Sequence, residues 1–152
     1  SDFAEMPEPK KEELNVVEVV ELAIDIFNRD QISFNPSSSK IQANFDRTQL
    51  IRVITNLLKN AFQAIPEDRN PEIAVNISEK DDEVNISISD NGYGISKMDM
   101  EKIFEPSFTT KSSGMGLGLS MIKSIITAYN GSITFNSKSN VGTTFNITFP
   151  KK

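Results

Sequence analysis

The sequence predicts an α+β fold, a two-layer α/β sandwich with three main helices on one face of a mixed, mostly antiparallel sheet. Two observations support this prediction. Apolar residues recur at helical spacing in three stretches, and about six short segments alternate apolar and polar residues as half-buried strands do. The length of 152 residues, 38% of them hydrophobic, suits one domain with its own core.

The helices are predicted from apolar spacing and from residues that cap helices. Asn15 is expected to begin the first helix. Asp46 is expected to cap the second, which runs to about Ile65 before a proline ends it. The third is expected over residues 117–129 and stops at Asn130-Gly131. The first 14 residues carry two prolines and a charge run, so we interpret them as the tail of a preceding element plus a linker.

Six short segments carry the strand pattern. Two flank the turn-rich loop NPSSS, two are joined by the charged turn EKDDE, and the last two form a hairpin across KSNVG. They are QISF, KIQANF, 72–78, 84–90, 132–137 and 143–150.

A polar segment, residues 96–113, separates the fourth strand from the third helix and is expected to contain one short helix. Within it, Phe104 and Phe108 bracket the tripeptide EPS. One interpretation is a loop anchored by two aromatic side chains. The other is a lid whose closure depends on those rings.

The composition excludes several classes of protein. A net charge of −5 argues against general nucleic-acid binding, which leaves a basic footprint. With no cysteine there is neither a disulfide nor a thiolate metal site. No apolar run is long enough to span a bilayer and no signal peptide is visible, so a cytoplasmic location is expected. The chain also has no histidine, the commonest acid–base residue.

The stretch TTKSSGMGLGLS, residues 109–120, has the ingredients of a phosphate-binding loop. It is not a P-loop, because that motif places its lysine directly after the last glycine, whereas Lys111 precedes the glycines. It does not fit the dinucleotide fingerprint either, because Gly114, Gly116 and Gly118 alternate. Another kind of nucleotide loop is indicated.

Asp90 ends a strand, VNISISD, whose three apolar residues face the helix layer, and by a period of two its carboxylate faces the same layer. A charge there must accept hydrogen bonds, either in an Asx turn or from a ligand. Gly92 and Gly94 favour a ligand, because they let backbone approach closely. Thr143 shares this face in the last strand and either completes a polar patch around the ligand or is an ordinary strand threonine.

Asn56, Asn60 and Gln63 lie at positions i, i+4 and i+7 of the second helix, on one flank. Amide oxygens are suitable neutral ligands for Mg²⁺, which otherwise keeps water and substrate phosphates. The alternative for each residue is a solvated polar face.

Five motifs in order resemble those of the catalytic ATP-binding domain of sensor histidine kinases. NLLKNA resembles the N box, DNGYGI the first glycine box, FEPSF the F box, GMGLGLS the second glycine box and GTTF the closing G[ST]xF motif. The resemblance covers essentially residues 15–150 and implies the Bergerat-type fold shared with gyrase, heat-shock chaperone and mismatch-repair ATPases. FTTK and QAI are most similar to the nitrogen-regulation branch. FAEMPEP resembles the end of the dimerisation helix, which implies a helix end and linker over 1–14 and the catalytic domain over 15–152.

The resemblance implies ATP and Mg²⁺ as ligands. Asp90 would accept the adenine amino group, with Thr143 supporting it through water, and Asn60 would coordinate Mg²⁺. Many family members have a lysine or arginine where this chain has Gln63, so Lys111 is expected to supply that charge. The residues implied in ATP binding are Asn56, Asn60, Gln63, Asp90, Gly92, Gly94, Ile95, Phe104, Thr110, Lys111, Gly114, Gly116, Leu117, Gly118, Leu119 and Thr143.

The implied function is that of a kinase domain donating the γ-phosphoryl group of ATP to a histidine on a separate dimerisation domain. The alternatives are an ATPase module that gates dimerisation and a non-catalytic ATP-sensing domain. The related hydrolases resemble one another in placing a glutamate four residues before the magnesium asparagine. Here that position is Asn56, which cannot activate water, so the kinase is favoured.

The absence of histidine means that the phosphoacceptor lies outside this chain. We therefore expect the chain alone to bind Mg-ATP without phosphorylating itself. The expected partners are ATP, the kinase's own dimerisation and histidine phosphotransfer domain and, through the full-length kinase, a response regulator receiver domain. Neither nucleic acid nor direct membrane contact is expected.

Overall fold

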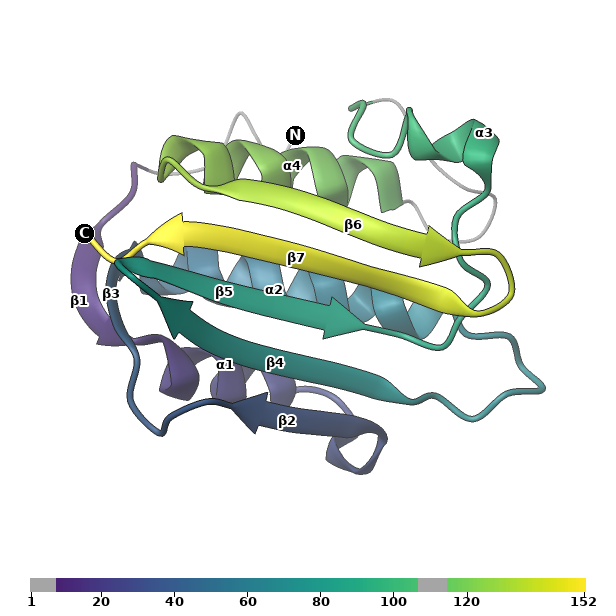
Figure 1. Ribbon diagram of the computed structural model, residues 1–152, viewed down its shortest axis with the longest axis horizontal. Helices are drawn as coiled ribbons and strands as arrows, with labels where there is room; N and C mark the ends of the chain where they lie inside the picture. Colours follow the sequence, from purple (N-terminus) through teal and green to yellow (C-terminus); the bar gives the residue numbers. More distant parts are fainter. Residues whose placement is uncertain (1–7, 107–114) are drawn as a thin grey trace.

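The computed structural model describes residues 8–106 and 115–152, with side chains from Gly118 onward in the second range. A five-stranded sheet forms one layer and helices form the other (Figure 1). The strand order is β2-β4-β5-β7-β6, in which β2 and β4 are parallel and the other neighbours antiparallel. The strands are β2 Ile32–Pro36, β4 Ile73–Lys80, β5 Glu83–Ser89, β6 Ser132–Lys138 and β7 Gly142–Pro150. This arrangement confirms the predicted α+β sandwich.

The main helices are those expected, with ends that differ slightly. They are α1 Val16–Ile24, α2 Arg47–Gln63 and α4 Met115–Ala128, beside a short α3 Lys97–Met100 and a 3-10 turn, η1 Arg29–Gln31. The predicted caps are confirmed, since Asn15 accepts a hydrogen bond from Val17 N and Asp46 from Gln49 N. Helix α2 ends two residues earlier than predicted, and α4 begins two residues earlier.

One strand was not predicted. β1, Lys11–Asn15, pairs antiparallel with β3, Gln42–Asp46, in a separate two-stranded sheet. Its charge run favoured a linker over a strand, and in the structure Leu14 is its one buried side chain. The Oδ2 atom of Asp46 also accepts a hydrogen bond from Lys10 N at 2.6 Å. The segment that enters the domain is therefore bonded to β3 along its length.

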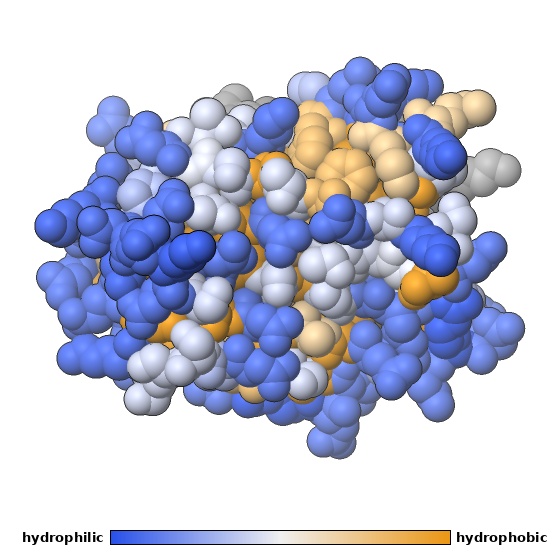
Figure 2. Space-filling view, viewed as in Figure 1, coloured by the Kyte–Doolittle hydropathy of each residue, from blue (hydrophilic) through white to orange (hydrophobic). Residues whose placement is uncertain are grey.

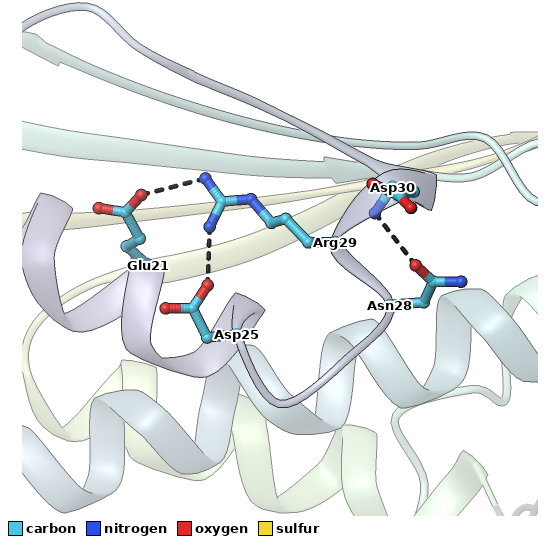
Figure 3. A network of polar contacts seen from close by, with 5 residues as sticks. All are labelled: Glu21, Asp25, Asn28, Arg29 and Asp30. Atoms are coloured by element: carbon cyan, nitrogen blue, oxygen red, sulfur yellow. Dashed lines mark hydrogen bonds and ion pairs between the residues drawn. The ribbon is translucent and has the colours of Figure 1, made fainter.

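A polar network joins the end of α1 to the turn before β2 (Figure 3). Arg29 donates to Asp25 Oδ1 at 2.7 Å and to Glu21 Oε2 at 3.0 Å, while Asn28 caps η1 by accepting from Asp30 N at 3.1 Å. Because these ion pairs are largely exposed, they contribute little to stability.

The two faces of the sheet differ sharply in composition. The face toward the helices carries the core, and the side chains of β5 and β7 on it are buried: Val84, Ile86, Ile88, Thr143, Phe145, Ile147 and Phe149. The opposite face is mostly hydrophilic, with an apolar area toward α3 (Figure 2). The inner face therefore places the end of β5 and the start of β7 against the helices. No helix in the described ranges is both long enough and apolar enough to cross a membrane.

Candidate functional site

Asp90 directly follows β5 and lies opposite Thr143 at the start of β7. Its backbone N donates to Thr143 O at 2.8 Å. Its Oδ1 atom accepts two backbone N–H groups, from Gly92 at 2.8 Å and from Thr143 at 3.2 Å. The Gly92 bond is the Asx turn that the sequence left open as an alternative. The other oxygen, Oδ2, has no hydrogen bond to any described residue, so an Asx turn and an open acceptor coexist on one carboxylate.

The electrostatic state of Asp90 follows from this position. Burial raises the pKa of the Asp90 carboxyl, and the hydrogen bonds from Gly92 and Thr143 partly oppose the rise. The ionised form is therefore held at a cost that two backbone donors do not fully offset. A further donor at Oδ2 would lower that cost, which makes the carboxylate suited to binding a hydrogen-bond donor.

Two residues that sequence reasoning missed, Ser137 and Gly142, contact Thr143 and Asp90 respectively. The Ser137 hydroxyl lies 2.7 Å from Thr143 Oγ1 and accepts from Ile95 N at 2.7 Å. A Cβ atom on Gly142 would lie 2.0 Å from the carbonyl oxygen of Asp90, at a φ of 147° that side chains rarely adopt. Two sequence signals were available: Ser137 is an inward-facing polar residue by period two, and Gly142 opens the GTTF motif.

The glycines of the loop after Asp90 are required first by the protein's own backbone. A Cβ atom on Gly92 would lie 2.4 Å from Ala64 O, and one on Gly94, at φ 77°, would lie 2.3 Å from Lys138 O. Tyr93 bonds on both sides of this loop, donating through its N to Ala64 O at 2.8 Å and accepting at its O from Asn140 N at 2.6 Å. The predicted role of Gly92 and Gly94 toward a ligand stays a prediction.

Arg69 also bonds to the loop that follows Asp90, and this contact was missed from the sequence. Arg69 Nη1 donates to the carbonyl oxygens of Asn91 and Gly92. The Asn91 side chain in turn accepts from Glu72 N at 2.9 Å and donates to Asn70 O at 2.9 Å. The loop that carries Asp90 is thus fixed from the end of α2, from the segment before β4 and from the β6–β7 turn.

The three predicted polar residues of α2 have different surroundings. Asn60 is 7% exposed, and its Nδ2 atom is buried without a partner, a state shared within the described ranges only by Thr55 Oγ1. Asn56 is partly buried and donates to Arg52 O at 2.9 Å. Gln63 is exposed. A buried NH₂ group without a partner can donate to an acceptor on a ligand, and among these three residues only Asn60 has one.

The second glycine motif lies across from this helix. A Cβ atom on Gly118, near the start of α4, would lie 3.8 Å from Asn56 Oδ1. The flank of α2 that carries Asn60 therefore faces the N-terminal part of α4, whose free amides can bind an anion. Leu119 and Ile95 belong to the buried core.

Phe104 packs against Phe135 of β6. Its ring lies 5.9 Å from that of Phe135, and Lys123 Nζ lies 5.1 Å from its centroid. An open hollow of about 530 Å³ lies beside it on the outer side of α4, lined by Phe104, Pro106, Ser120, Lys123, Ser124, Thr127 and Ala128. This lining includes neither Asp90 nor Asn60, so the hollow is separate from their site.

Some predicted residues fall outside the described part of the chain. These are Thr110, Lys111 and Gly114, together with Phe108 of the expected lid. Gly116 and Leu117 are described only as part of helix α4. Among the side chains that are described, no three His, Cys, Asp or Glu residues gather as a metal site. A metal here would therefore depend on amide oxygen and on the substrate's own phosphates.

The fold is that of an ATPase-type catalytic domain. The family model for "Histidine kinase-, DNA gyrase B-, and HSP90-like ATPase" matches residues 45–152, and the chain belongs to this family. Within the family, its relatives identify it as the ATPase-type catalytic domain of histidine kinases.

These relatives include both sequences and a solved structure. The sensor protein FixL of Bradyrhizobium diazoefficiens is 36% identical over 121 residues, covering 79% of this chain and 24% of FixL. A putative NtrY-like sensor histidine kinase of Rickettsia conorii is 32% identical over 154 residues, covering 99% of this chain and 26% of that protein. The nucleotide-free catalytic domain of the histidine kinase ThkA is similar with a TM-score of 0.82 and 31% identity, covering 93% of this chain and 96% of ThkA's.

The matches confirm the resemblance drawn from the five motifs, and the NtrY-like relative agrees with the nitrogen-regulation branch. The chain spans about a quarter of the length of the curated relatives it matches. Family membership implies ATP binding and kinase-type activity dependent on ATP.

Proposed function

We propose that this chain binds Mg-ATP and donates its γ-phosphoryl group to a histidine on a separate dimerisation domain of a two-component sensor kinase. The observation that carries the proposal is the Asp90 carboxylate, which is raised in pKa and has one oxygen bonded twice and the other open. Such a group binds a hydrogen-bond donor, and the exocyclic amino group of adenine is one.

In this proposal the site for adenine is preformed. Asp90 Oδ1 is fixed by two backbone N–H groups, so Oδ2 points in one direction and needs no rearrangement to accept the amino group. Thr143 supports Asp90 directly through its backbone N, in addition to the water-mediated support inferred from the family. Gly92 and Gly94 keep the loop against α2 and the β6–β7 turn.

The phosphates would lie between α2 and the start of α4. The carboxamide oxygen of Asn60 is of the kind that Mg²⁺ accepts, and its buried Nδ2 atom, which lacks a partner, could donate to a phosphate oxygen, with Asn56 beside it. When bound, Mg²⁺ neutralises charge on the phosphates. The backbone amides at the start of α4 would bind the phosphate oxygens, and Lys111 is proposed to add a positive charge from the neighbouring segment.

Transfer to a histidine is favoured over hydrolysis by one residue. Asn56 occupies the place of the glutamate that serves as general base in related hydrolases, and its amide donates to Arg52 O at 2.9 Å. An amide takes no proton from water at neutral pH, so water attacks slowly here. An imidazole is itself a nucleophile and needs mainly to be positioned. The dimerisation domain that presents it and the receiver domain that takes the phosphoryl group are the proposed partners.

Calorimetric titration with ATP, with and without Mg²⁺, tests the adenine assignment. In Asp90→Asn the amide oxygen keeps the two backbone donors, so its NH₂ group faces the amino group of adenine, donor against donor. Affinity should fall by about 10- to 100-fold, the value of a hydrogen bond to a charged group. Asp68→Asn is the matched control, because Asp68 is exposed and should not alter affinity.

Two outcomes contradict different parts of the proposal. Unchanged affinity in Asp90→Asn would overturn the assignment of this carboxylate to adenine. A wild-type chain that does not bind ATP at all would overturn the proposed function.

A further inference from the structure

The hydroxyl of Ser137 has three hydrogen-bonding neighbours behind the proposed adenine site. It accepts from Ile95 N at 2.7 Å, donates to Gly142 O at 3.2 Å, and lies 2.7 Å from Thr143 Oγ1. A serine hydroxyl has one proton and two lone pairs. Three neighbours therefore use its full capacity.

The identity of those neighbours decides which hydroxyl donates in the Ser137–Thr143 pair. A carbonyl oxygen only accepts, so the proton of Ser137 goes to Gly142. A backbone N–H only donates, so Ile95 takes one lone pair of Ser137. The 2.7 Å distance between Ser137 Oγ and Thr143 Oγ1 allows either hydroxyl to donate; with the other two bonds assigned in this way, the second lone pair of Ser137 accepts from Thr143. The proton of the Thr143 hydroxyl is thereby directed toward Ser137, and its lone pairs remain for other partners.

Thr143 and Asp90 are neighbours across the sheet on the face toward the helices. Strands β5 and β7 pair Ser89 with Thr144, so Asp90 and Thr143 form the next pair, with side chains on one face. The backbone bonds between them confirm this register. Thr143 is 4% exposed, so its hydroxyl cannot turn freely into solvent. With this assignment, the open oxygen of Asp90 and the lone pairs of Thr143 are hydrogen-bond acceptors on the same face of the sheet; we call this pair the acceptor wall.

We propose that Ser137 is a specificity-determining positioning residue, which fixes the Thr143 hydroxyl as an acceptor toward the base. This rests on the proposed function. A wall of acceptors matches a purine with a 6-amino group, which brings two N–H donors. It opposes a purine with a 6-oxo group, which brings lone pairs against lone pairs. Ser137 acts through Thr143 and does not itself touch the nucleotide.

The test compares the binding of Mg-ATP and Mg-ITP by calorimetry. The two nucleotides differ only in the purine: adenine has a 6-amino group and no proton on N1, whereas hypoxanthine has a 6-oxo group and a proton on N1. In Ser137→Ala the Thr143 hydroxyl loses its proton acceptor and is free to donate to a 6-oxo group. The preference for ATP over ITP should fall by about fivefold, the value of one net hydrogen bond. A loss of affinity equal for both nucleotides would show a scaffolding role only and overturn the proposal.

Ser132→Ala is the matched control, since Ser132 is an exposed serine on the same strand. It should leave the preference unchanged. Thr143→Val removes the hydroxyl itself and should lower the preference even if Ser137→Ala does not fold; an unchanged preference there overturns the proposal. The double variant should match Thr143→Val alone, because Ser137 acts through Thr143, and a further drop contradicts that route.

Failure of this inference can be distinguished from failure of the proposed function. If the wild-type chain binds neither nucleotide, the proposed function fails. If it binds ATP in preference to ITP and Ser137→Ala keeps that preference, only the role of Ser137 fails. A wild-type chain that binds both equally has no acceptor wall, and the inference is overturned.

Discussion

The carboxylate of Asp90 is largely buried, and the loss of water around it makes its ionised form unfavourable. Because burial raises its pKa, the folded state binds the proton more tightly than the unfolded state does. The stability that this carboxyl contributes is therefore present below its unfolded pKa and is lost as the pH rises through its folded pKa. At neutral pH the ionised group lowers stability, and a ligand's donor would recover part of that loss.

We therefore predict that Asp90→Asn, which weakens ATP binding, does not weaken the free domain. The amide oxygen can accept from Gly92 and Thr143 as the carboxylate does, while the desolvated charge is gone. At pH 7 the variant should melt at or above the wild-type temperature, and the difference should shrink as the pH falls toward 4. Thermal denaturation across this range measures it. A variant that melts well below wild type at pH 7 would contradict the argument.

Other residues of the site could not be found from the sequence, for a common physical reason. Arg69 bonds to Asn91, 22 positions away, and Ser137 to Ile95, 42 positions away, and both bonds depend on how loops meet in space. Arg69 stands in no motif or periodic pattern, and the period of two places Ser137 on the inner face without indicating its partner. Gly92 and Gly94 were found, but the contacts that require them, with Ala64 and Lys138, come from distant loops and could not be inferred locally.

At the scale of elements, helix α2 begins beside the N-terminal strand β1 and ends near the proposed phosphate region. Its cap, Asp46, accepts from Gln49 N at 2.9 Å through one oxygen and from Lys10 N at 2.6 Å through the other. The backbone N of Asp46 donates to Tyr129 Oη at 3.1 Å, which ties the end of α4 to the same point. One residue thus joins β1, β3, α2 and α4, while Asn60 lies near the other end of α2.

We predict that Asp46→Ala lowers the free energy of unfolding by about 2 kcal/mol, the sum of a lost cap and a second lost hydrogen bond. Asp46→Asn is the matched control, because it keeps an oxygen for the cap but its NH₂ group cannot accept from Lys10. It should cost about half as much. Urea denaturation at pH 7 measures both. Equal losses in the two variants would mean that the cap contributes nothing.

The residues around Asp46 include features that the sequence predicts, the helix caps, and one that it does not, strand β1. The caps Asn15 and Asp46 were predicted because a cap depends on residues within one turn. β1 was missed because its partner lies far along the chain, with Lys11 opposite Asp46, and its exposed charged residues leave no alternating pattern. The long apolar stripe of α2 was reliable because it spans several turns, whereas its end at Gln63 depends on local contacts.

At the scale of the molecule, the proposed function assigns to this fold the nucleotide-binding half of a phosphoryl transfer. The sheet fixes Asp90 and Thr143 at the ends of two strands, and α2 faces α4 across the proposed phosphate region. In the proposed function the histidine that accepts the phosphoryl group lies on another domain, since this sequence contains no histidine. The family could be predicted from the five motifs together. Each motif is short and weak alone, but few unrelated sequences would contain all five in this order within 152 residues.

The last prediction follows from this division. Incubated alone with γ-labelled Mg-ATP, the chain should bind the nucleotide, acquire no stable label and release phosphate slowly, because Asn56 replaces a general base. Adding the separately produced dimerisation domain of the same kinase should place label on that domain, while a chain carrying Asp90→Asn should transfer far less. Stable label on this chain alone would contradict a histidine acceptor outside it. Rapid phosphate release without transfer would favour the ATPase alternative, because water would then be the acceptor that this site activates.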